Sequence, residues 1–282
     1  MNKLTLLALA AASVVLAACG DNITHPPDRS TYTETGSGGN ALTCLPNLDG
    51  KVSHEELAAA LDISVSYLIG KNRAVDLVGV TDGAGKRIWD FSKDYADDAK
   101  IDIAATSLVG RWYQASFPDG QWVAPADAAE STEGVYSADD QAIYLHGLAS
   151  KDENPAAPLG KTLIAYKQKV AVYRFPLELG ASWISVGEVE NAMANGLPYN
   201  GTHTYEVKDD GTGELQLHDF TFTQAHRIRT TLTITGPVGA DVVKRQTGFV
   251  SECFGEVLRA TAAVDEPNVD FTQAAELRRV GQ

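Results

Sequence analysis

Three cysteines, Cys19, Cys44 and Cys253, have the most distinctive chemistry in this sequence. Cys19 closes the first stretch of the chain, in which a short positively charged head is followed by an uncharged, largely apolar run from Leu4 to Val15. A run of about a dozen such residues is too short to span a bilayer and has the length of a signal-peptide core. Ala17 and Ala18 are small enough to fit a signal-peptidase cleft, so the Cys19 thiol stands at a position where it can be modified.

The segment Leu16-Ala17-Ala18-Cys19 resembles a bacterial lipobox. The resemblance implies that the Cys19 thiol is joined to diacylglycerol, that the signal peptide 1–18 is removed, and that the new amino group is acylated. Two or more acyl chains hold a protein firmly on a membrane, whereas a single chain holds it weakly. The alternative is an ordinary signal peptide that releases a soluble protein. Because Gly20 follows the cysteine in place of an aspartate, the outer membrane is favoured, although Asp21 comes one place later.

In the oxidising compartment that this signal implies, Cys44 and Cys253 are expected to form a disulfide. The bond would join the two ends of the folded region and close a loop of about 200 residues, which contributes about 4–5 kcal/mol in the chain-entropy model. Two free or buried thiols are the alternative, because the sequence does not place the two Cα atoms within bonding reach.

An acidic loop after Cys44 has spacing that suggests a calcium site. With Gly50 at the sixth place of an EF-hand loop, the ligand places fall on Asn47, Asp49, Ser53 and Glu56. Leu45, at the first place, has no side-chain oxygen. The structural alternative is stronger: Asp-Gly forms a turn, and Ser53-x-x-Glu56 is a capping box that opens a helix near residues 54–67. We predict no cofactor.

Signatures of common enzymes are absent from the sequence, including a Gly-x-Ser-x-Gly elbow, a His-Glu-x-x-His motif and a phosphate-binding glycine loop. His203, His218 and His226 form the only local group of histidines, but histidines on strands more often have structural roles than metal-binding ones. A hydrolase would require convergent polar groups, such as His218 with Asp219 and Glu214. We therefore predict a protein that is not an enzyme and has no catalytic residues.

Charge and composition narrow the class of protein. Removal of residues 1–18 takes away one charged residue, Lys3, and changes the net charge from −14 to −15. Such an acidic surface repels nucleic acid, so no nucleic-acid partner is expected. Residues 19–43 are rich in Gly, Pro, Ser and Thr and predict a lipidated, disordered tether. The remaining segment, 44–282, is long enough for a single globular domain with a real core.

From about Val75 onward the pattern predicts β-strands. Hairpin signals occur at Asp82-Gly83, Asp119-Gly120 and Asp210-Gly211, with a weaker one at Asp139-Asp140. Alternation is clearest in Arg227–Ile234, and a change of phase predicts a bulge or bend near residues 218–219. Two segments, 188–195 and 271–279, fit either helix or strand. The whole predicts an all-β domain, mainly an antiparallel sandwich or a strongly curved sheet, with a short N-terminal helix.

Three segments resemble a recurring pattern in uncharacterised secreted bacterial β proteins: Tyr173–Gly180, Asp210–Leu215 and Ala225–Arg229. In that pattern a Phe-Pro-Leu segment precedes a Gly-x-Gly-x-Leu hairpin and an alternating strand. The resemblance covers about a quarter of the chain and its motifs are structural, so it implies a β fold and no activity.

Aromatic residues near the Asp119-Gly120 turn have two interpretations. Trp112, Tyr113 and Trp122 would form a platform for a glycan or peptide if they are exposed. If they are buried, they are core residues, which is the interpretation we favour because aromatic side chains usually supply core area.

The leading functional hypothesis is a lipid-anchored protein of the cell envelope, with a β domain that binds an unidentified envelope or extracellular ligand or serves structurally. Its expected partner is the membrane, through the lipid on Cys19. The first alternative is a periplasmic carrier of lipids or lipoproteins with an apolar cavity. The third hypothesis is the hydrolase described above.

Overall fold

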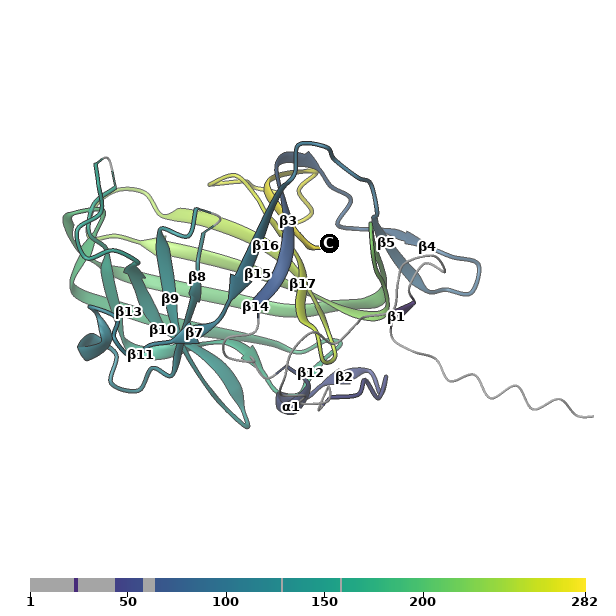
Figure 1. Cartoon of the computed structure of the whole chain (residues 1–282), viewed down its shortest axis with the longest axis horizontal. Helices are drawn as coiled ribbons and strands as arrows, with labels where there is room; N and C mark the ends of the chain where they lie inside the picture. The colour runs from purple at the N-terminus through teal and green to yellow at the C-terminus, as the bar shows by residue number, and fades with distance from the viewer. Residues whose placement is uncertain (1–22, 25–43, 58–63, 128, 158) are drawn as a thin grey trace, which may run out of the picture.

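The computed structural model describes residues 23–24, 44–57, 64–127, 129–157 and 159–282 (Figure 1). Cys19 and the rest of the predicted tether, apart from Ile23 and Thr24, lie outside these residues. The first strands are β1 (Ile23–Thr24), β2 (Lys51–Val52), β3 (Ser64–Ala74), β4 (Val80–Thr81), β5 (Arg87–Phe91), β6 (Ala99–Ala104), β7 (Thr106–Ser107), β8 (Trp122–Pro125) and β9 (Thr132–Asp139).

The second half of the chain contains β10 (Ala142–Ser150), β11 (Leu163–Arg174), β12 (Leu177–Glu178), β13 (Ser182–Ala194), β14 (Leu197–Leu217), β15 (Thr221–Thr235), β16 (Val242–Ser251), β17 (Gly255–Thr261) and β18 (Gln273–Val280). The described helices are short: α1 (His54–Leu57) and the 3-10 turn Gln114–Ser116. The prediction of an all-β domain is confirmed.

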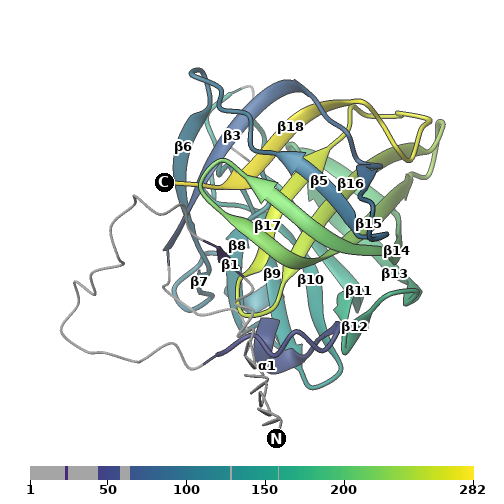
Figure 2. The same ribbon diagram turned by 90° about the vertical axis from the view of Figure 1, so that its right-hand side faces the viewer.

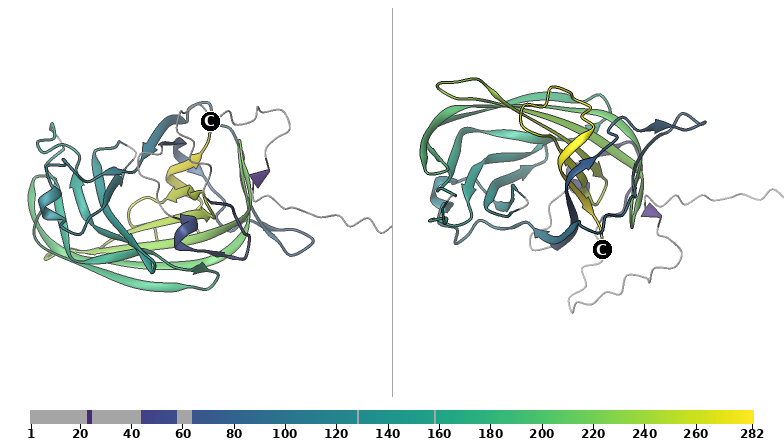
Figure 3. Two further views of the ribbon diagram at one scale, coloured as in Figure 1. Left: turned by 60° about the horizontal axis from the view of Figure 1, so that its bottom comes forward. Right: turned by 90° about the horizontal axis from the view of Figure 1, so that it is seen from above.

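Sixteen of the described strands form a single, strongly curved sheet. Its main path runs β6-β3-β18-β17-β16-β15-β14-β13-β11-β10-β9-β8-β7. The two ends of this path, β6 and β7, are successive parts of one extended segment, separated by Ala105. The sheet therefore curls until its ends nearly meet, and it has an inside and an outside (Figure 2). Figure 3 shows the teal strands at one end and the yellow strands toward the other, joined by the long green strands.

The predicted helix near residues 54–67 is wrong in its last part. The described helix covers His54–Leu57, and Ser64 to Tyr67 belong to β3. Both sequence and pairing explain the difference. Ser64 to Tyr67 alternate polar and apolar residues, and β3 pairs with β18 on one side and β6 on the other. Residues 58–63 lie outside the described part of the chain.

The longest strands show why the predicted turns were partly wrong. Asp210-Gly211 is not a hairpin turn but lies within β14, at an irregularity in its register with β15. The chain turns instead at residues 218–219, where only a bulge or bend was predicted, and the Leu217 amide donates to the Phe220 carbonyl. Asp-Gly pairs favour turns locally, but thirteen paired positions with β15 outweigh that preference here.

Other predictions of local structure are confirmed. Asp82-Gly83 joins β4 to β5, and Asp139-Asp140 joins β9 to β10. Both ambiguous segments are mostly strand: residues 188–194 belong to β13 and residues 273–279 belong to β18. Asp119-Gly120 is part of a turn that precedes β8, but a longer segment with a 3-10 turn links β7 to β8.

The core consists of three clusters of buried side chains. One fills the half of the sheet from β9 to β14 and includes Val52 and Leu57 of the N-terminal segment. A second lies around Trp89 and Phe249, where β5 covers β14 to β18. The third surrounds Tyr113 and Phe117 beside β8 and β9. Among the described residues, no helix is long and apolar enough to cross a membrane.

Candidate functional site

A pocket opens where β14 changes its partner. The first part of β14, up to Lys208, pairs with β13, whereas its last part, from Gly213, pairs with the parallel strand β5. The stretch between these two ladders faces the pocket. A β-carbon on Gly213 would lie 2.4 Å from the Arg87 carbonyl oxygen, so the close approach of β5 requires glycine at this position.

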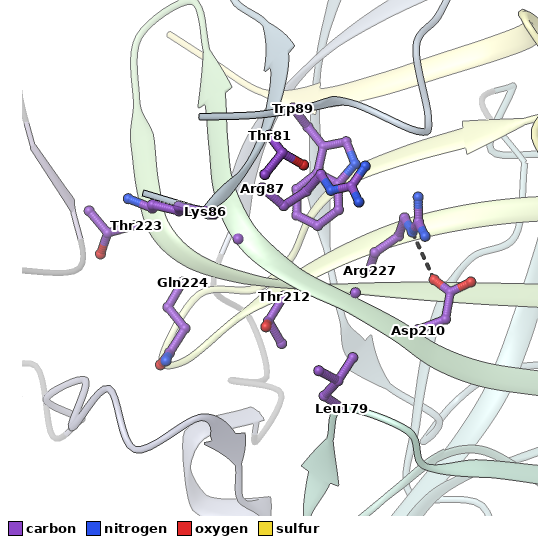
Figure 4. A pocket seen from close by; sticks show the side chains of 13 residues that line it. Thr81, Lys86, Arg87, Trp89, Leu179, Asp210, Thr212, Thr223, Gln224 and Arg227 are labelled. Atoms are coloured by element: carbon purple, nitrogen blue, oxygen red, sulfur yellow. Dashed lines mark hydrogen bonds and ion pairs between the residues drawn. The ribbon is translucent and has the colours of Figure 1, made fainter. Parts of the chain in front are cut away.

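The pocket has a volume of about 470 Å³. Figure 4 shows its lining, in which most of the labelled side chains are polar or charged. Its lining residues are Thr81, Gly85, Lys86, Arg87, Trp89, Leu179, Asp210, Gly211, Thr212, Gly213, Thr223, Gln224 and Arg227. Three of them are cationic and one is anionic, in a protein whose net charge is −14. The pocket lining is therefore net positive, whereas the whole chain is net negative.

Arg227 is the most firmly held of the three cations. Its Nε donates to Asp210 Oδ1 over 2.8 Å, its Nη1 donates to the Leu77 carbonyl, and the guanidinium lies 5.5 Å from the Trp89 ring centroid. Only 11 % of its side-chain surface is exposed. These contacts fix the guanidinium plane, so Arg227 needs little further ordering to receive a ligand.

Lys86 and Arg87 enter the pocket from the start of β5. Lys86 Nζ lies 2.7 Å from Glu214 Oε2, and this hydrogen bond lowers the pKa of the Glu214 carboxyl. Arg87 Nη1 donates to the Val78 carbonyl over 2.7 Å. Trp89, by contrast, is only 1 % exposed and supports the pocket wall without offering a ring face for stacking. The arrangement suits an anionic group better than a sugar ring.

Of the three predicted hydrolase residues, His218 and Asp219 lie beside each other, whereas Glu214 has other partners. His218 Nδ1 lies 3.3 Å from the Ser92 carbonyl, and its Nε2 lies 3.9 Å from Asp219 Oδ1. Asp219 Oδ2 accepts from the Gln282 amide. Glu214 instead accepts hydrogen bonds from Lys86 and from Gln216 Nε2.

The three local histidines also have separate surroundings. His226 and Asp209 are both fully buried, with Nδ1 2.6 Å from Asp209 Oδ2. His203 lies between two tyrosines: its Nδ1 is 2.8 Å from the Tyr166 hydroxyl and its Nε2 is 2.9 Å from that of Tyr199. Within the described ranges, no three His, Cys, Asp or Glu side chains are grouped so that they could hold a metal.

The burial of His203 predicts a pH effect on stability. Burial, with a smaller contribution from Lys244, lowers the pKa of His203 to about 4, whereas an unfolded histidine titrates near 6.5. The unfolded chain therefore takes up this proton first, and the stabilisation present above pH ~6.5 is lost as the pH falls toward ~4. Chemical unfolding of the wild type is expected to show a loss of about 2 kcal/mol between pH ~7 and ~5. His203→Gln should reduce that slope, and an equal slope in both proteins would contradict this assignment.

The acidic N-terminal loop has a structural role. Ser53 N donates to Glu56 Oε2 over 2.8 Å and Glu56 N donates to Ser53 Oγ over 3.4 Å, which confirms the capping box. Asn47 Oδ1 and Asp49 Oδ1 accept from backbone amides two residues ahead, those of Asp49 and Lys51. These oxygens bind the chain's own backbone, so the structure offers no argument for calcium at this loop.

The predicted disulfide is present. Cys44 and Cys253 are bonded, with a Cα–Cα distance of 5.5 Å. Beside it, the fully buried Glu252 accepts the amides of Asn47 and Leu48 through Oε2, and β2 pairs with β12. The N-terminal segment is thus attached to the sheet at several points.

The aromatic residues near residues 119–120 belong to the core, as favoured. Tyr113 is 1 % exposed and packs edge-on against Trp112 and Phe117. Trp122 is also buried and stacks on Tyr136. The Trp112 indole donates to the Ser150 carbonyl.

Sequence reasoning missed the residues of the pocket. Lys86 and Arg87 follow the Asp82-Gly83 hairpin signal after two intervening residues, and Arg227 was predicted only as the start of a strand. Adjacent cations beside a predicted turn were the available signal, but nothing in the sequence places them opposite Arg227. Comparison of the chain with protein-family models, with curated proteins and with solved structures found no match.

Proposed function

We propose that this chain is a lipid-anchored protein of the bacterial cell envelope whose β domain binds a small anionic ligand without catalysing a reaction. The observation that supports the binding role is the convergence of Lys86, Arg87 and Arg227 on one pocket of an acidic protein. The different partners of His218 and Glu214 lend no support to the hydrolase alternative.

The anchor is proposed from the sequence of residues 1–20, with Cys19 as the lipidated residue and the outer membrane as the destination. Membrane fractionation tests it. Wild-type protein is expected in the membrane fraction, and Cys19→Ala should move it to the soluble fraction. Mass spectrometry of an unmodified mature N-terminus would contradict the anchor without affecting the pocket.

The ligand class follows from the charges and from the size of the pocket. A volume of about 470 Å³ is in the range of small-molecule sites. Guanidinium groups donate paired hydrogen bonds to planar or tetrahedral oxyanions, and lysine adds a point charge. A carboxylate or phosphate group therefore matches the lining, whereas a cation would face three cationic side chains and only one anionic one, Asp210.

Calorimetric titration with inorganic phosphate and with citrate tests the pocket. Binding of at least one of these probes is expected, and Arg87→Gln and Lys86→Gln should each weaken it about 10-fold, because each removes one charge-assisted hydrogen bond. Lys100→Gln is the matched control, since Lys100 is an exposed lysine of β6 outside the pocket lining. Equal affinities for the wild type and an Arg87→Gln/Lys86→Gln double variant would overturn the proposal.

A further inference from the structure

A second group of polar side chains meets inside the curved sheet. The Tyr173 hydroxyl donates to Glu256 Oε2 over 3.0 Å. Tyr173 is on β11 and Glu256 is on β17, and four strands, β13 to β16, separate these two in the sheet. With about 4.8 Å between neighbouring strands, a direct hydrogen bond between them must cross the interior. Both side chains therefore point into the space that the sheet encloses.

Residues from five strands take part in this interior cluster, which we define as Tyr67, Tyr136, Tyr173, Glu256, Arg259 and Arg278. The Tyr67 hydroxyl donates to the Glu256 carbonyl over 3.0 Å, and Arg259 Nε lies 2.6 Å from Glu256 Oε1. The Arg278 guanidinium lies 5.9 Å from the Tyr67 ring centroid. Phenol and guanidinium groups thus surround a single carboxylate.

The two arginines of the interior cluster are direct neighbours. Arg259 and Arg278 are Cα partners in the β17–β18 ladder, so two like charges lie opposite each other. Glu256 pairs with Arg259, and Glu276 pairs with Arg278 over 3.3 Å. Arg278 is only 5 % exposed, and its Nε has no hydrogen-bond partner among the described residues. A buried donor of this kind is costly unless an acceptor reaches it.

The tyrosines of the interior cluster are largely removed from water, but two of its charged side chains keep some accessible surface. Burial, together with Glu256, raises the pKa of Tyr67 to about 12 and that of Tyr173 well above its ordinary value. Nevertheless, 26 % of the Arg259 side-chain surface and 13 % of that of Glu256 remain accessible. Charged groups that are mostly buried but keep some accessible surface are suited to contact a small molecule.

We propose that the interior cluster is a second binding site, which takes a small carboxylate with a flat aromatic body. The carboxylate would accept a hydrogen bond from Arg278 Nε, which has no partner among the described residues, because a guanidinium matches carboxylate geometry. It would also accept from the Tyr173 hydroxyl, which would exchange its present acceptor, Glu256 Oε2, for the ligand. The aromatic body would pack against the rings of Tyr67, Tyr136 and Tyr173. A plain acyl chain fits poorly. It would displace water from these polar groups and offer no hydrogen-bonding atoms in its place.

Benzoate is the probe for this site, and titration calorimetry is the measurement. Benzoate is expected to bind the wild type, and Tyr173→Phe and Arg278→Gln should each weaken binding about 5-fold or more. Tyr144→Phe is the matched control: it removes a hydroxyl from the neighbouring strand β10, and the Tyr144 ring lies under the half-exposed Lys169 and outside the interior cluster. This control should bind benzoate like the wild type.

Two further measurements separate this site from the pocket and from a loss of folding. The Arg87→Gln/Lys86→Gln double variant should retain benzoate binding, which separates this site from the pocket beside β14. Thermal unfolding of each variant shows whether it folds. If Arg278→Gln does not fold, comparison of Tyr173→Phe with Tyr144→Phe still tests the proposal. The proposal is overturned if benzoate does not bind the wild type, if the pocket double variant abolishes binding, or if Tyr173→Phe binds as tightly as Tyr144→Phe.

Discussion

Replacing both Cys44 and Cys253 with serine is expected to lower the free energy of unfolding by about 5 kcal/mol. The bond closes a loop with a sequence separation of 209 residues, so its removal returns a large amount of conformational entropy to the unfolded chain. A typical domain is stable by about 5–15 kcal/mol, so the variant would lose a large fraction of its stability.

Urea unfolding, followed by tryptophan fluorescence, measures this loss. The wild type in the presence of a reductant should unfold like the double serine variant, and the reductant should not affect that variant. The contacts of Glu252 with Asn47 and Leu48 remain in both proteins and keep the N-terminal segment docked. A difference below about 1 kcal/mol would show that these contacts, and not loop closure, dominate.

Removing the Asp209 carboxylate is expected to cost about 3–5 kcal/mol. Both Asp209 and His226 have no exposed side-chain surface, and their contact of 2.6 Å joins β14 to β15. Asp209→Ala would leave the His226 ring buried without this partner, and a cavity would replace the carboxylate.

The matched control is Asp241→Ala, because Asp241 is exposed at the loop before β16 and its removal should change stability by less than about 0.5 kcal/mol. A second variant, Asp209→Leu/His226→Leu, replaces both partners by apolar groups and should recover much of the loss. If the double variant is as unstable as Asp209→Ala, packing around these positions and not the polar pair explains the effect.

The sequence alone determined the class of fold and several local features. Alternation in Arg227–Ile234 correctly predicted a strand, because a half-buried strand needs a period of two regardless of its partners. The capping box at Ser53 and Glu56 was predictable because both bonds join residues three apart. The disulfide was predictable from two cysteines that follow a predicted signal peptide, although the sequence did not show that they were within reach.

Tertiary structure decided the continuation of β14 through Asp210-Gly211, because the pairing energy of a long ladder overrides the turn preference of a single Asp-Gly pair. It also decided both candidate sites. Lys86 and Arg227 are 141 positions apart, and Tyr173 and Glu256 are 83 apart, yet each pair lines one site. Contacts between such distant residues depend on the order, register and curvature of the strands. These are set by the packing of the whole chain and cannot be read from the residue type at any one position.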